Sequence, residues 1–328
     1  MSDAVDLVYL WCDDADPVWH AKRVTCARAH GIRIGDANNG KARYVSNDEL
    51  RYSLRSADMY VPWIRKVHLV VDDDATLPSW LRVDSERLHV VRHSEILPVD
   101  MLPCFNSNSI EQGLFRIEGL AEHFLYACDD MMFGRRLAPT FFFASDGFPI
   151  CRYAGKLPGG KLQMYTQTVA NTNRLLVSRF GPVTPFAEAS WRMPHHNVDA
   201  YLRSDYQACH ELFEKELDET TRNPFRTGTE YERALYTGYQ LCVEHGHYRL
   251  ARRRTSLKRS FVKRLVFPGY ADSLEFKGQE WRTAEKSLDR FRPGLFCFND
   301  TSRSTDADHR WLRQFFDRRF PAKSSFEK

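Results

Sequence analysis

Residues 102–134, LPCFNSNSIEQGLFRIEGLAEHFLYACDDMMFG, join a turn, a helix and a strand that ends in two acids. The amide-rich segment 105–108 has the composition of a turn. Apolar residues at helical spacing predict an amphipathic helix over 110–120, and the apolar run 124–127 predicts a buried strand.

Asp129 and Asp130 follow that predicted strand directly. Two carboxylates next to a buried strand cost free energy unless something pairs with them. Because successive strand residues point to opposite faces, both acids can reach one ligand only where the strand ends and the chain turns. Ligands of open α/β sheets bind at this edge, and a hard cation such as Mg²⁺, shared with substrate phosphates, suits two carboxylates. The alternative is two solvated aspartates in a turn.

The remainder of residues 1–150 repeats the pattern of an apolar strand followed by polar or acidic residues. Strands are predicted at 6–11, 67–71 and 88–91, and helices at 18–32 and 48–56. Ser46 or Asn47 is expected to cap the second helix. Strands that alternate with helices predict an α/β fold with a mostly parallel sheet covered by helices.

The second half, 151–328, is predicted to be mainly helical, after an irregular or antiparallel start. Helices are expected at 170–180, 198–217, 228–243 and 311–320, and a last short strand at 295–298. The tract 252–264 is basic with interleaved apolar residues. It could meet an anionic polymer acceptor or the headgroups of a membrane, or it could be a solvated face.

The composition is that of a water-soluble globular protein of one large or two ordinary domains. The 328 residues are 43% hydrophobic and 27% charged, with a net charge of +4 that does not by itself indicate a nucleic-acid partner. The eight cysteines form no CxxC pair, which argues against a zinc site and favours a reduced, cytosolic protein. We find no signal-peptide pattern, and no apolar run approaches the roughly 20 residues that span a bilayer.

Several segments, taken together and in order, resemble the conserved regions of the Stealth family. They are the strand 6–11 with Asp16 and Pro17, the run ELRYSLRS at 49–56, the segments 62–66 and 80–81, the block 105–134, His196 with Phe225 and Arg226, and CFND at 297–300. The resemblance covers nearly the whole chain. This sequence departs from the family pattern at Ser46, at Phe115 and at His195-His196-Asn197.

The resemblance implies a single catalytic domain over 1–328, with a Rossmann-like sheet similar to GT-A nucleotide-sugar transferases. It implies transfer of hexose-1-phosphate, such as GlcNAc-1-phosphate, from a UDP-sugar donor to a hydroxyl of a saccharide or polysaccharide acceptor, with release of UMP. The implied cofactor is Mg²⁺ or Mn²⁺, and the implied setting is capsule or exopolysaccharide synthesis in the cytoplasm or at the inner face of the membrane.

The resemblance also implies roles for particular residues. Asp129 and Asp130 would bind the metal, with Asn299 or Asp300 completing the shell, unless these last two only form a turn. Arg226 would hold phosphate oxygens, with Arg51 and Arg116 as further candidates. Arg51 and Arg116 could instead orient the acidic loops. The alternative for Arg226 is a helix-capping arginine on the surface, and for Arg51 a place on the surface.

His196 is the predicted general base, because an imidazole can take a hydroxyl proton near neutral pH. His195 is the competing candidate, and a structural histidine is the alternative for either. Asp13 and Asp16 could contact nucleotide or acceptor, although Asp16 could equally cap the following helix.

Asn106 and Asn108 carry amides that could hold sugar hydroxyls or build their turn. Two rival functions stay open beside phosphotransfer: a metal-dependent glycosyltransferase that releases UDP, and a non-enzymatic protein that binds polyanions or nucleic acid. Acids at the ends of several apolar strands argue against the second rival, so no nucleic-acid partner is predicted.

Overall fold

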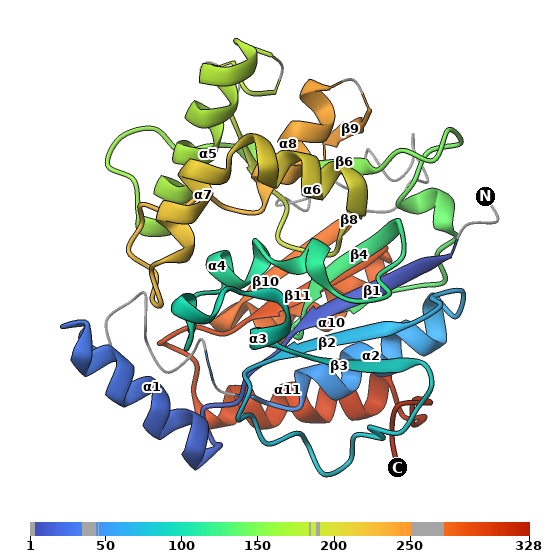
Figure 1. Cartoon of the computed structure of the whole chain (residues 1–328). Helices are drawn as coiled ribbons and strands as arrows, with labels where there is room; N and C mark the ends of the chain where they lie inside the picture. Colours follow the sequence, from blue (N-terminus) through green and yellow to red (C-terminus); the bar gives the residue numbers. More distant parts are fainter. Residues whose placement is uncertain are drawn as a thin grey trace.

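The computed structural model describes residues 4–34, 44, 46–183, 185–187, 191–243, 245–250 and 272–328. The basic tract 252–264 lies outside these ranges. A five-stranded sheet in the order β3-β2-β1-β4-β8 forms the centre of the molecule (Figure 1). Its strands are β1 (Val5–Leu10), β2 (Val67–Val71), β3 (Leu88–Arg92), β4 (His123–Cys128) and β8 (Asp199–Leu202). The first four are mutually parallel and β8 is antiparallel to β4, which confirms the predicted α/β fold.

The parallel strands are apolar because helices cover both faces of the sheet. On one face, Leu7 and Tyr9 of β1 pack with Leu50 of α2 (Glu49–Tyr60). On the other face, Val8 packs in a cluster with residues of α3 (His93–Ile96), α4 (Ser107–Glu111) and α6 (Arg203–Leu212). Figure 1 shows α2 behind the sheet and α3 and α4 in front of it. The helix α1 (Pro17–Ala29) follows β1.

The ends of the central strands lie level with one another. Leu10 at the end of β1 pairs with Val70 of β2 and with Cys128 at the end of β4. The loops that follow these strands, including Asp129 and Asp130, therefore meet at one edge of the sheet, where ligands bind in folds of this class.

The second half is helical as predicted, and it also contains two small sheets. One has the order β7-β6-β9, built from β6 (Ile150–Lys156), β7 (Arg192–Pro194) and β9 (His247–Leu250). It lies beside the helices α5 (Met164–Phe180), α6, α7 (Glu214–Thr221) and α8 (Ala234–Cys242) (Figure 1).

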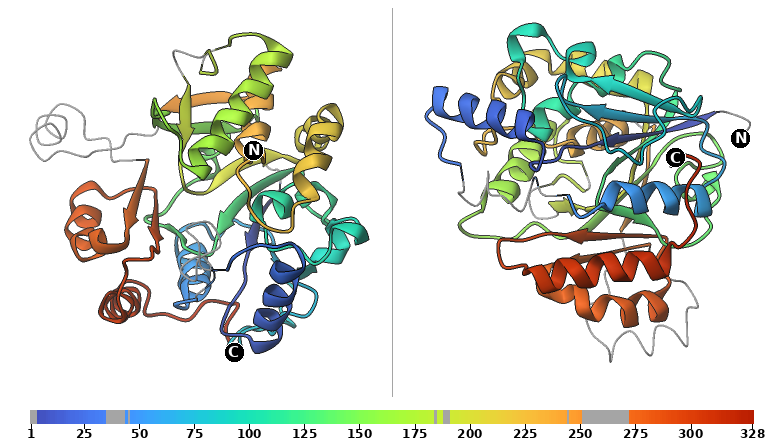
Figure 2. Two further views of the ribbon diagram at one scale, coloured as in Figure 1. Left: turned by 90° about the vertical axis from the view of Figure 1, so that its left-hand side faces the viewer. Right: turned by 90° about the horizontal axis from the view of Figure 1, so that it is seen from below.

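The other small sheet links the two halves of the chain. Its order is β10-β11-β5, from β10 (Ser273–Lys277), β11 (Leu295–Asn299) and β5 (Met131–Phe133). The helices α10 (Trp281–Phe291) and α11 (Asp306–Arg319) lie side by side against it (Figure 2). Short 3₁₀ turns occupy Val99–Met101, Leu114–Arg116, Pro139–Phe141 and Gly278–Glu280. Because β5 begins directly after Asp130, pairing of β5 with β11 fixes the position of the acidic turn.

Three local predictions were wrong. The helix predicted over 110–120 ends at Glu111, and a 3₁₀ turn follows Gly113. Gly113 approaches the backbone of Ile96 so closely that a Cβ would lie 2.5 Å from its carbonyl oxygen, so packing against α3 replaces a continuous helix.

The other two errors lie at element boundaries. Residues 198–202 were predicted as helix, but Asp199–Leu202 pair with β4 as an edge strand, and this long-range pairing overrides the local pattern. The N-cap of α2 is Asp48, not Ser46 or Asn47, and its side chain makes no capping hydrogen bond.

Candidate active site at the carboxyl edge of the sheet

Asp130 is the meeting point of three segments that are distant in sequence. Its Oδ2 accepts a hydrogen bond from Cys297 Sγ of β11 at 3.1 Å and lies 3.9 Å from His196 Nε2. The potential ligand atoms of Asp130, His196 and Cys297 all lie within 4.8 Å of one another. Asp130 Oδ1 is buried and has no hydrogen-bond partner among the described residues, so this oxygen is available to a cation.

Glu49 and Asp129 add two more carboxylates to this point. Glu49, the first residue of α2, accepts hydrogen bonds from the backbone and the side chain of Asn47. Burial, together with the charge of Asp130, raises the pKa of Glu49 to about 7. Burial and the charges of Glu49 and Asp130 likewise raise the pKa of Asp129 well above its usual value. Glu49 and Asp129, which resist ionisation beside Asp130, need a proton or a cation.

This donor set fits a divalent cation in part. Carboxylate oxygens suit Mg²⁺ and Mn²⁺, whereas the imidazole and the thiol are ligands that softer transition metals prefer. Asp129 and Asp130 can hold the cation through oxygen, with His196 free to ligate or to exchange a proton. Cys297 and Glu49 were missed at the sequence level, because only the pairing of β11 with β5 and the entry of α2 bring them to Asp130.

The two adjacent histidines have different surroundings. His195 is buried, and its ring nitrogens lie 2.9 Å from Asp199 Oδ1 and 3.4 Å from Ser273 Oγ. The side chain of His196 is 25% exposed and faces Asp130. Burial on its own would lower the pKa of His196, but the interaction with Asp130 outweighs it and raises this pKa above the ordinary value. The structure therefore places His196, and not His195, at the acidic turn.

A network of buried charged residues supports the segment that carries His195 and His196, through Asp199. Arg233 Nε donates to Asp199 Oδ2 at 2.9 Å, and its Nη1 lies 3.2 Å from Glu232 and 4.0 Å from Glu111. Tyr126 of β4 donates to Glu111 at 2.8 Å. Glu111 and Tyr126 lie within the block 105–134 that carries the family resemblance, whereas no signal in the sequence marked Asp199, Glu232 or Arg233.

The loop that carries Arg226 is built by Asn106. The buried Asn106 side chain donates to the carbonyl of Asn223 at 3.1 Å and accepts from the backbone of Asn108 at 3.2 Å. Asn106 therefore constructs its turn, which was one of its two predicted roles. Arg226 is half-buried, and its Nη2 donates to Ser107 Oγ at 2.5 Å. The side chain of Asn108 is half-buried in the same turn.

The two candidates at the end of β11, Asn299 and Asp300, have different partners. Asn299 shares a strand face with Cys297, and its Nδ2 donates to Glu275 Oε1 at 2.7 Å. Asp300 accepts from His309 Nε2 of α11 at 3.0 Å and from the backbone of Thr301. The structure thus brings Asn299 to the face of β11 that carries Cys297 and ties Asp300 to α11.

Arg51 and Arg116 are engaged elsewhere. Arg51 Nε donates to Glu327 Oε2 at 2.6 Å. Arg116 donates to the carbonyl of Ile96 at 3.3 Å, and its Nη2 lies 3.2 Å from His210 Nε2. Neither arginine is paired with the acidic turn.

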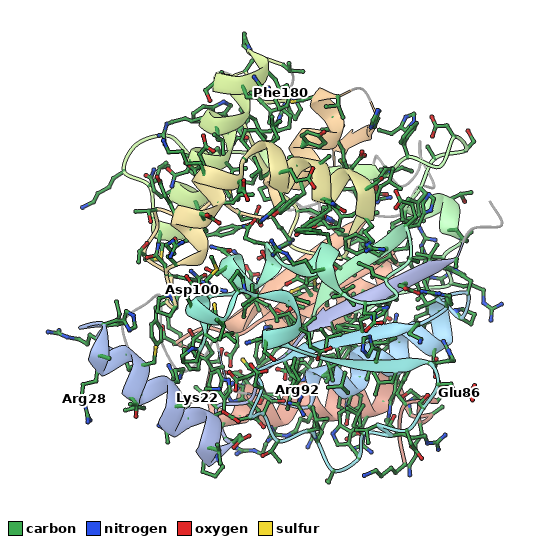
Figure 3. The ribbon with its side chains drawn as sticks, viewed as in Figure 1. Lys22, Arg28, Glu86, Arg92, Asp100 and Phe180 are labelled. Atoms are coloured by element: carbon green, nitrogen blue, oxygen red, sulfur yellow. The ribbon has the colours of Figure 1, made fainter. Side chains whose placement is uncertain are left out.

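The acids that follow β2 are neutralised by neighbouring cations. Lys22 Nζ of α1 donates to Asp72 and to Asp74, each at 2.8 Å. Arg92 donates to the carbonyl of Asp72 at 2.9 Å. Lys22 and Arg92 are labelled in Figure 3, on either side of this loop. This acidic loop is therefore structural.

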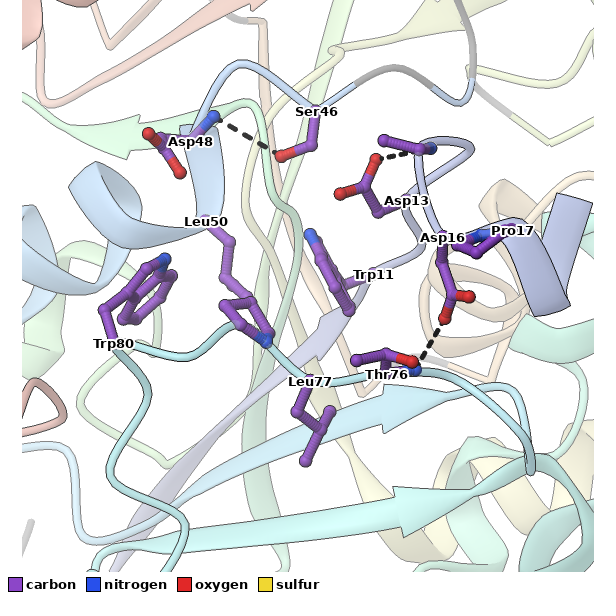
Figure 4. A pocket seen from close by; sticks show the side chains of 12 residues that line it. Trp11, Asp13, Asp16, Pro17, Ser46, Asp48, Leu50, Thr76, Leu77 and Trp80 are labelled. Carbon is purple, nitrogen blue, oxygen red and sulfur yellow. Dashed lines mark hydrogen bonds between the residues drawn. The ribbon is translucent and has the colours of Figure 1, made fainter.

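Asp13 and Asp16 lie at a cavity of about 310 Å³ beside the end of β1 (Figure 4). Asp16 caps α1 by accepting from the backbone of Val18 at 2.9 Å, and it also accepts from the backbone of Thr76 at 2.7 Å. Asp13 accepts from the backbone of Ala15 at 2.9 Å. Asp16 is thus occupied as a helix cap, whereas Asp13 has one carboxylate oxygen bound to Ala15 and keeps the other.

Comparison with known proteins gives a consistent set of relatives. Residues 43–150 match the family model described as Stealth protein CR2, conserved region 2. The chain is 34% identical, over 99% of its length, to exopolysaccharide phosphotransferase SCO6021 of Streptomyces coelicolor, covering 57% of that protein. It is 30% identical, again over 99% of its length, to exopolysaccharide phosphotransferase CpsY of Mycobacterium tuberculosis, covering 58% of that protein. The chain therefore spans little more than half the length of these relatives.

A solved galactosyltransferase, LgtC, in complex with donor and acceptor sugar analogues, aligns with 98% of this chain and 96% of its own at a TM-score of 0.45 and 10% identity. Within the described ranges, no helix is both long and apolar enough to cross a membrane. Residues 43–150 thus carry the conserved region 2 of Stealth proteins, and nearly the whole of this chain is similar to part of the exopolysaccharide phosphotransferases.

Proposed function

We propose that this chain transfers a sugar phosphate during exopolysaccharide synthesis, moving hexose-1-phosphate from a UDP-sugar to a saccharide hydroxyl with the help of Mg²⁺ or Mn²⁺. The observation that carries the proposal is the group of Glu49, Asp129 and Asp130 beside His196 at the carboxyl edge of the sheet. Carboxylates packed this closely are stable in their charged form only next to a cation. A divalent cation is also what a diphosphate substrate brings to such an edge.

The residues divide the reaction between them. His196 takes the proton of the acceptor hydroxyl as its oxygen attacks the β-phosphorus, and the bond between this phosphorus and the bridging oxygen of UMP breaks. Arg226 binds phosphate oxygens through its fork of donors. Asp129 and Asp130 hold the cation, which, when bound, neutralises the charge of the phosphates.

We further propose that 1–150 and 151–328 act as one catalytic domain. The pairing of β4 with β8 and of β5 with β11 supports this, because each pair joins one half to the other. The expected location in the cytoplasm, and the contact of 252–264 with a membrane or an anionic acceptor, stay predictions.

The nucleotide product tests the proposal. The protein is incubated with UDP-GlcNAc, Mg²⁺ and a capsule-type oligosaccharide, the nucleotides are separated by chromatography, and the saccharide product is examined by ³¹P NMR. Attack on phosphorus gives UMP and a phosphodiester signal in the saccharide. UDP with no phosphorus in the product would instead establish the glycosyltransferase alternative, in which attack occurs at the sugar carbon. Chain carrying Asp130→Asn serves as the inactive control.

A further inference from the structure

The cavity at the end of β1 has a lining suited to a particular class of molecule. Its walls include Trp11, Asp13, Ser46, Asp48, Leu77 and Trp80 (Figure 4). Its volume of about 310 Å³ is of the size that small ligands occupy. The aromatic side chains come from two different loops, so the cavity is formed by the fold and not by one local turn.

Trp11 presents an unused hydrogen-bond donor there. The residue is only 5% exposed, and its indole Nε1 has no hydrogen-bond partner among the described residues. Figure 4 shows this nitrogen on the side of the ring that faces Ser46 and Asp13. A buried N–H without an acceptor costs free energy, and a ligand oxygen in the cavity would remove that cost.

The cavity also offers acceptors. Asp48 occupies the N-cap position of α2, yet its side chain accepts no capping hydrogen bond from the helix. Asp13 uses one oxygen for the backbone of Ala15 and keeps the other. Free carboxylate oxygens next to an indole N–H match hydroxyl groups, because a hydroxyl both donates and accepts.

The charge of the lining excludes anions. Among the described residues, no lysine, arginine or histidine lines the cavity, and three aspartates do. A phosphate would be repelled by this field. The faces of Trp80 and Leu77 provide apolar surface for the carbon–hydrogen face of a ring. The occupant that satisfies all three conditions is a neutral, polyhydroxylated ring.

The cavity adjoins the acidic turn from one side. Leu10 pairs with Cys128, so Trp11 and Asp129 directly follow the ends of two neighbouring strands. Glu49 lies in the sequence between Asp48 and Leu50, which both line the cavity. Arg226 lies beside the start of α4, where its Nη2 donates to Ser107 Oγ, and α4 covers the other face of the sheet. The residue proposed to bind phosphate and the cavity therefore lie towards opposite faces of the sheet.

We infer that this cavity is the subsite for a neutral sugar ring of the acceptor saccharide. Trp80 would stack on the ring, Trp11 would donate to a hydroxyl, and Asp13 and Asp48 would accept from others. The assignment to the acceptor rests on the proposed sugar-phosphate transfer, whereas the assignment to a neutral sugar rests on the cavity alone.

Steady-state kinetics test the acceptor assignment with Trp80→Ala, Trp80→Phe and Asp13→Asn. Trp80→Ala and Asp13→Asn should each raise the KM for the acceptor roughly tenfold, the effect of losing one good contact. The KM for the UDP-sugar should stay unchanged, and Trp80→Phe should recover most of the affinity for the acceptor. Asp84→Asn, an exposed acid elsewhere in the loop between β2 and β3, is the control. A raised KM for the donor with an unchanged KM for the acceptor would overturn the assignment and make the cavity a nucleoside site.

Binding without turnover tests the sugar assignment independently. Saturation-transfer NMR is recorded with lactose, maltose, chitobiose and uridine, each alone, on wild type and Trp80→Ala. The indole N–H resonance of Trp11, assigned with Trp11→Phe, is followed in ¹⁵N-labelled protein. At least one disaccharide should bind to the wild type and shift the Trp11 indole resonance. The saturation-transfer signal of that disaccharide should be lost with Trp80→Ala. Binding of no disaccharide, or binding unaffected by Trp80→Ala, would refute the inference. If wild type releases no UMP but these results hold, the proposed function fails and the sugar site stands.

Discussion

At the scale of single residues, the site depends on carboxylates that are held together against their mutual repulsion. Asp130 contacts Cys297 and faces His196. Burial and the charge of Asp130 raise the pKa of Glu49, and burial and the charges of Glu49 and Asp130 raise the pKa of Asp129. The carboxylates proposed to bind the cation therefore lower the stability of the metal-free fold. Substitution of one of them should reduce turnover without reducing the melting temperature.

Asp130→Asn is expected to abolish measurable turnover, because the amide removes the charge that binds the cation. The melting temperature should stay the same or rise slightly, since one of three repelling charges is lost. Nucleotide chromatography and thermal unfolding, with Asp84→Asn alongside, measure both quantities. Retained activity in the variant, or full wild-type activity in EDTA, would contradict the metal role of Asp130.

Substitution of the two histidines should affect different quantities, kcat for His196 and stability for His195. His196→Ala should lower kcat by about 10²–10⁴-fold with little change in stability, because a general base is lost. His195→Ala should lower the free energy of unfolding by about 1–3 kcal/mol, because it leaves Asp199 short of a buried partner. Similar, mild losses of kcat in both variants would make both histidines structural.

Titration of the imidazole gives a further check on His196. In metal-free protein Asp130 raises the pKa of His196, so NMR spectra recorded without metal should show this ring titrating above the ordinary 6.5. Asp130→Asn should lower the midpoint, because it removes the carboxylate charge beside the ring. A wild-type midpoint at or below 6.5 would argue against the contact.

At the scale of secondary-structure elements, the helix α2 connects the acidic site with a buried group of ion pairs. Its first turn supplies Glu49 to the acids, and its outer face is clamped by Glu327. Arg55 donates to both oxygens of Glu327 at 2.7 and 2.8 Å, and Arg51 donates at 2.6 Å. Burial alone would raise the pKa of Glu327, but hydrogen bonds from the arginines and from the backbone of Ser324 lower it to about 2.

Glu327→Gln should therefore destabilise the protein in a pH-dependent way. A carboxyl whose folded pKa is depressed contributes stability above its unfolded pKa of 4.5, and this is lost as pH falls towards 2. The variant should lose about 2–3 kcal/mol of unfolding free energy at pH 7. Urea unfolding at pH 7, 4 and 3 measures the free energy of unfolding of both proteins. The difference between variant and wild type should become smaller as the pH falls. A constant difference would mean that the ion pairs are not its source.

At the scale of the whole molecule, cation binding should control stability. A carboxyl whose folded pKa is raised, as in Glu49, contributes stability below its unfolded pKa of 4.5 that is lost as pH rises through about 7. Without metal, the free energy of unfolding should fall by on the order of 2 kcal/mol between pH 5 and pH 8.

Addition of Mg²⁺ or Mn²⁺ should reverse that loss at pH 8, because the cation binds the folded state alone. Thermal unfolding across a metal titration measures the effect, and Glu49→Gln should weaken the pH dependence in metal-free protein. A melting temperature at pH 8 that does not respond to either metal would contradict a cation site.

Most of the central sheet could be predicted, because buried parallel strands are apolar runs that local sequence reveals. Asp129 and Asp130 could be found for the same reason, since they follow such a run. The edge strand Asp199–Leu202 was missed because its pairing with β4 is not local. Cys297, Glu49 and Arg233 were missed because only tertiary packing shows that they converge. His195 and His196 are adjacent in the sequence, and only the structure shows that the first contacts Asp199 and the second faces Asp130.

The joining of β5 to β11 has a consequence for the newly made chain. Asp130 and Cys297 are 167 residues apart, so at cellular synthesis rates roughly 8–33 s separate their emergence from the ribosome. Throughout that interval β5 lacks the strand that fixes it, and the acids after β4 lack the thiol of Cys297. Nascent chains released before β11 should thus expose an uncovered strand edge to aggregation and chaperones, and the contact between Asp130 and Cys297 cannot form on them.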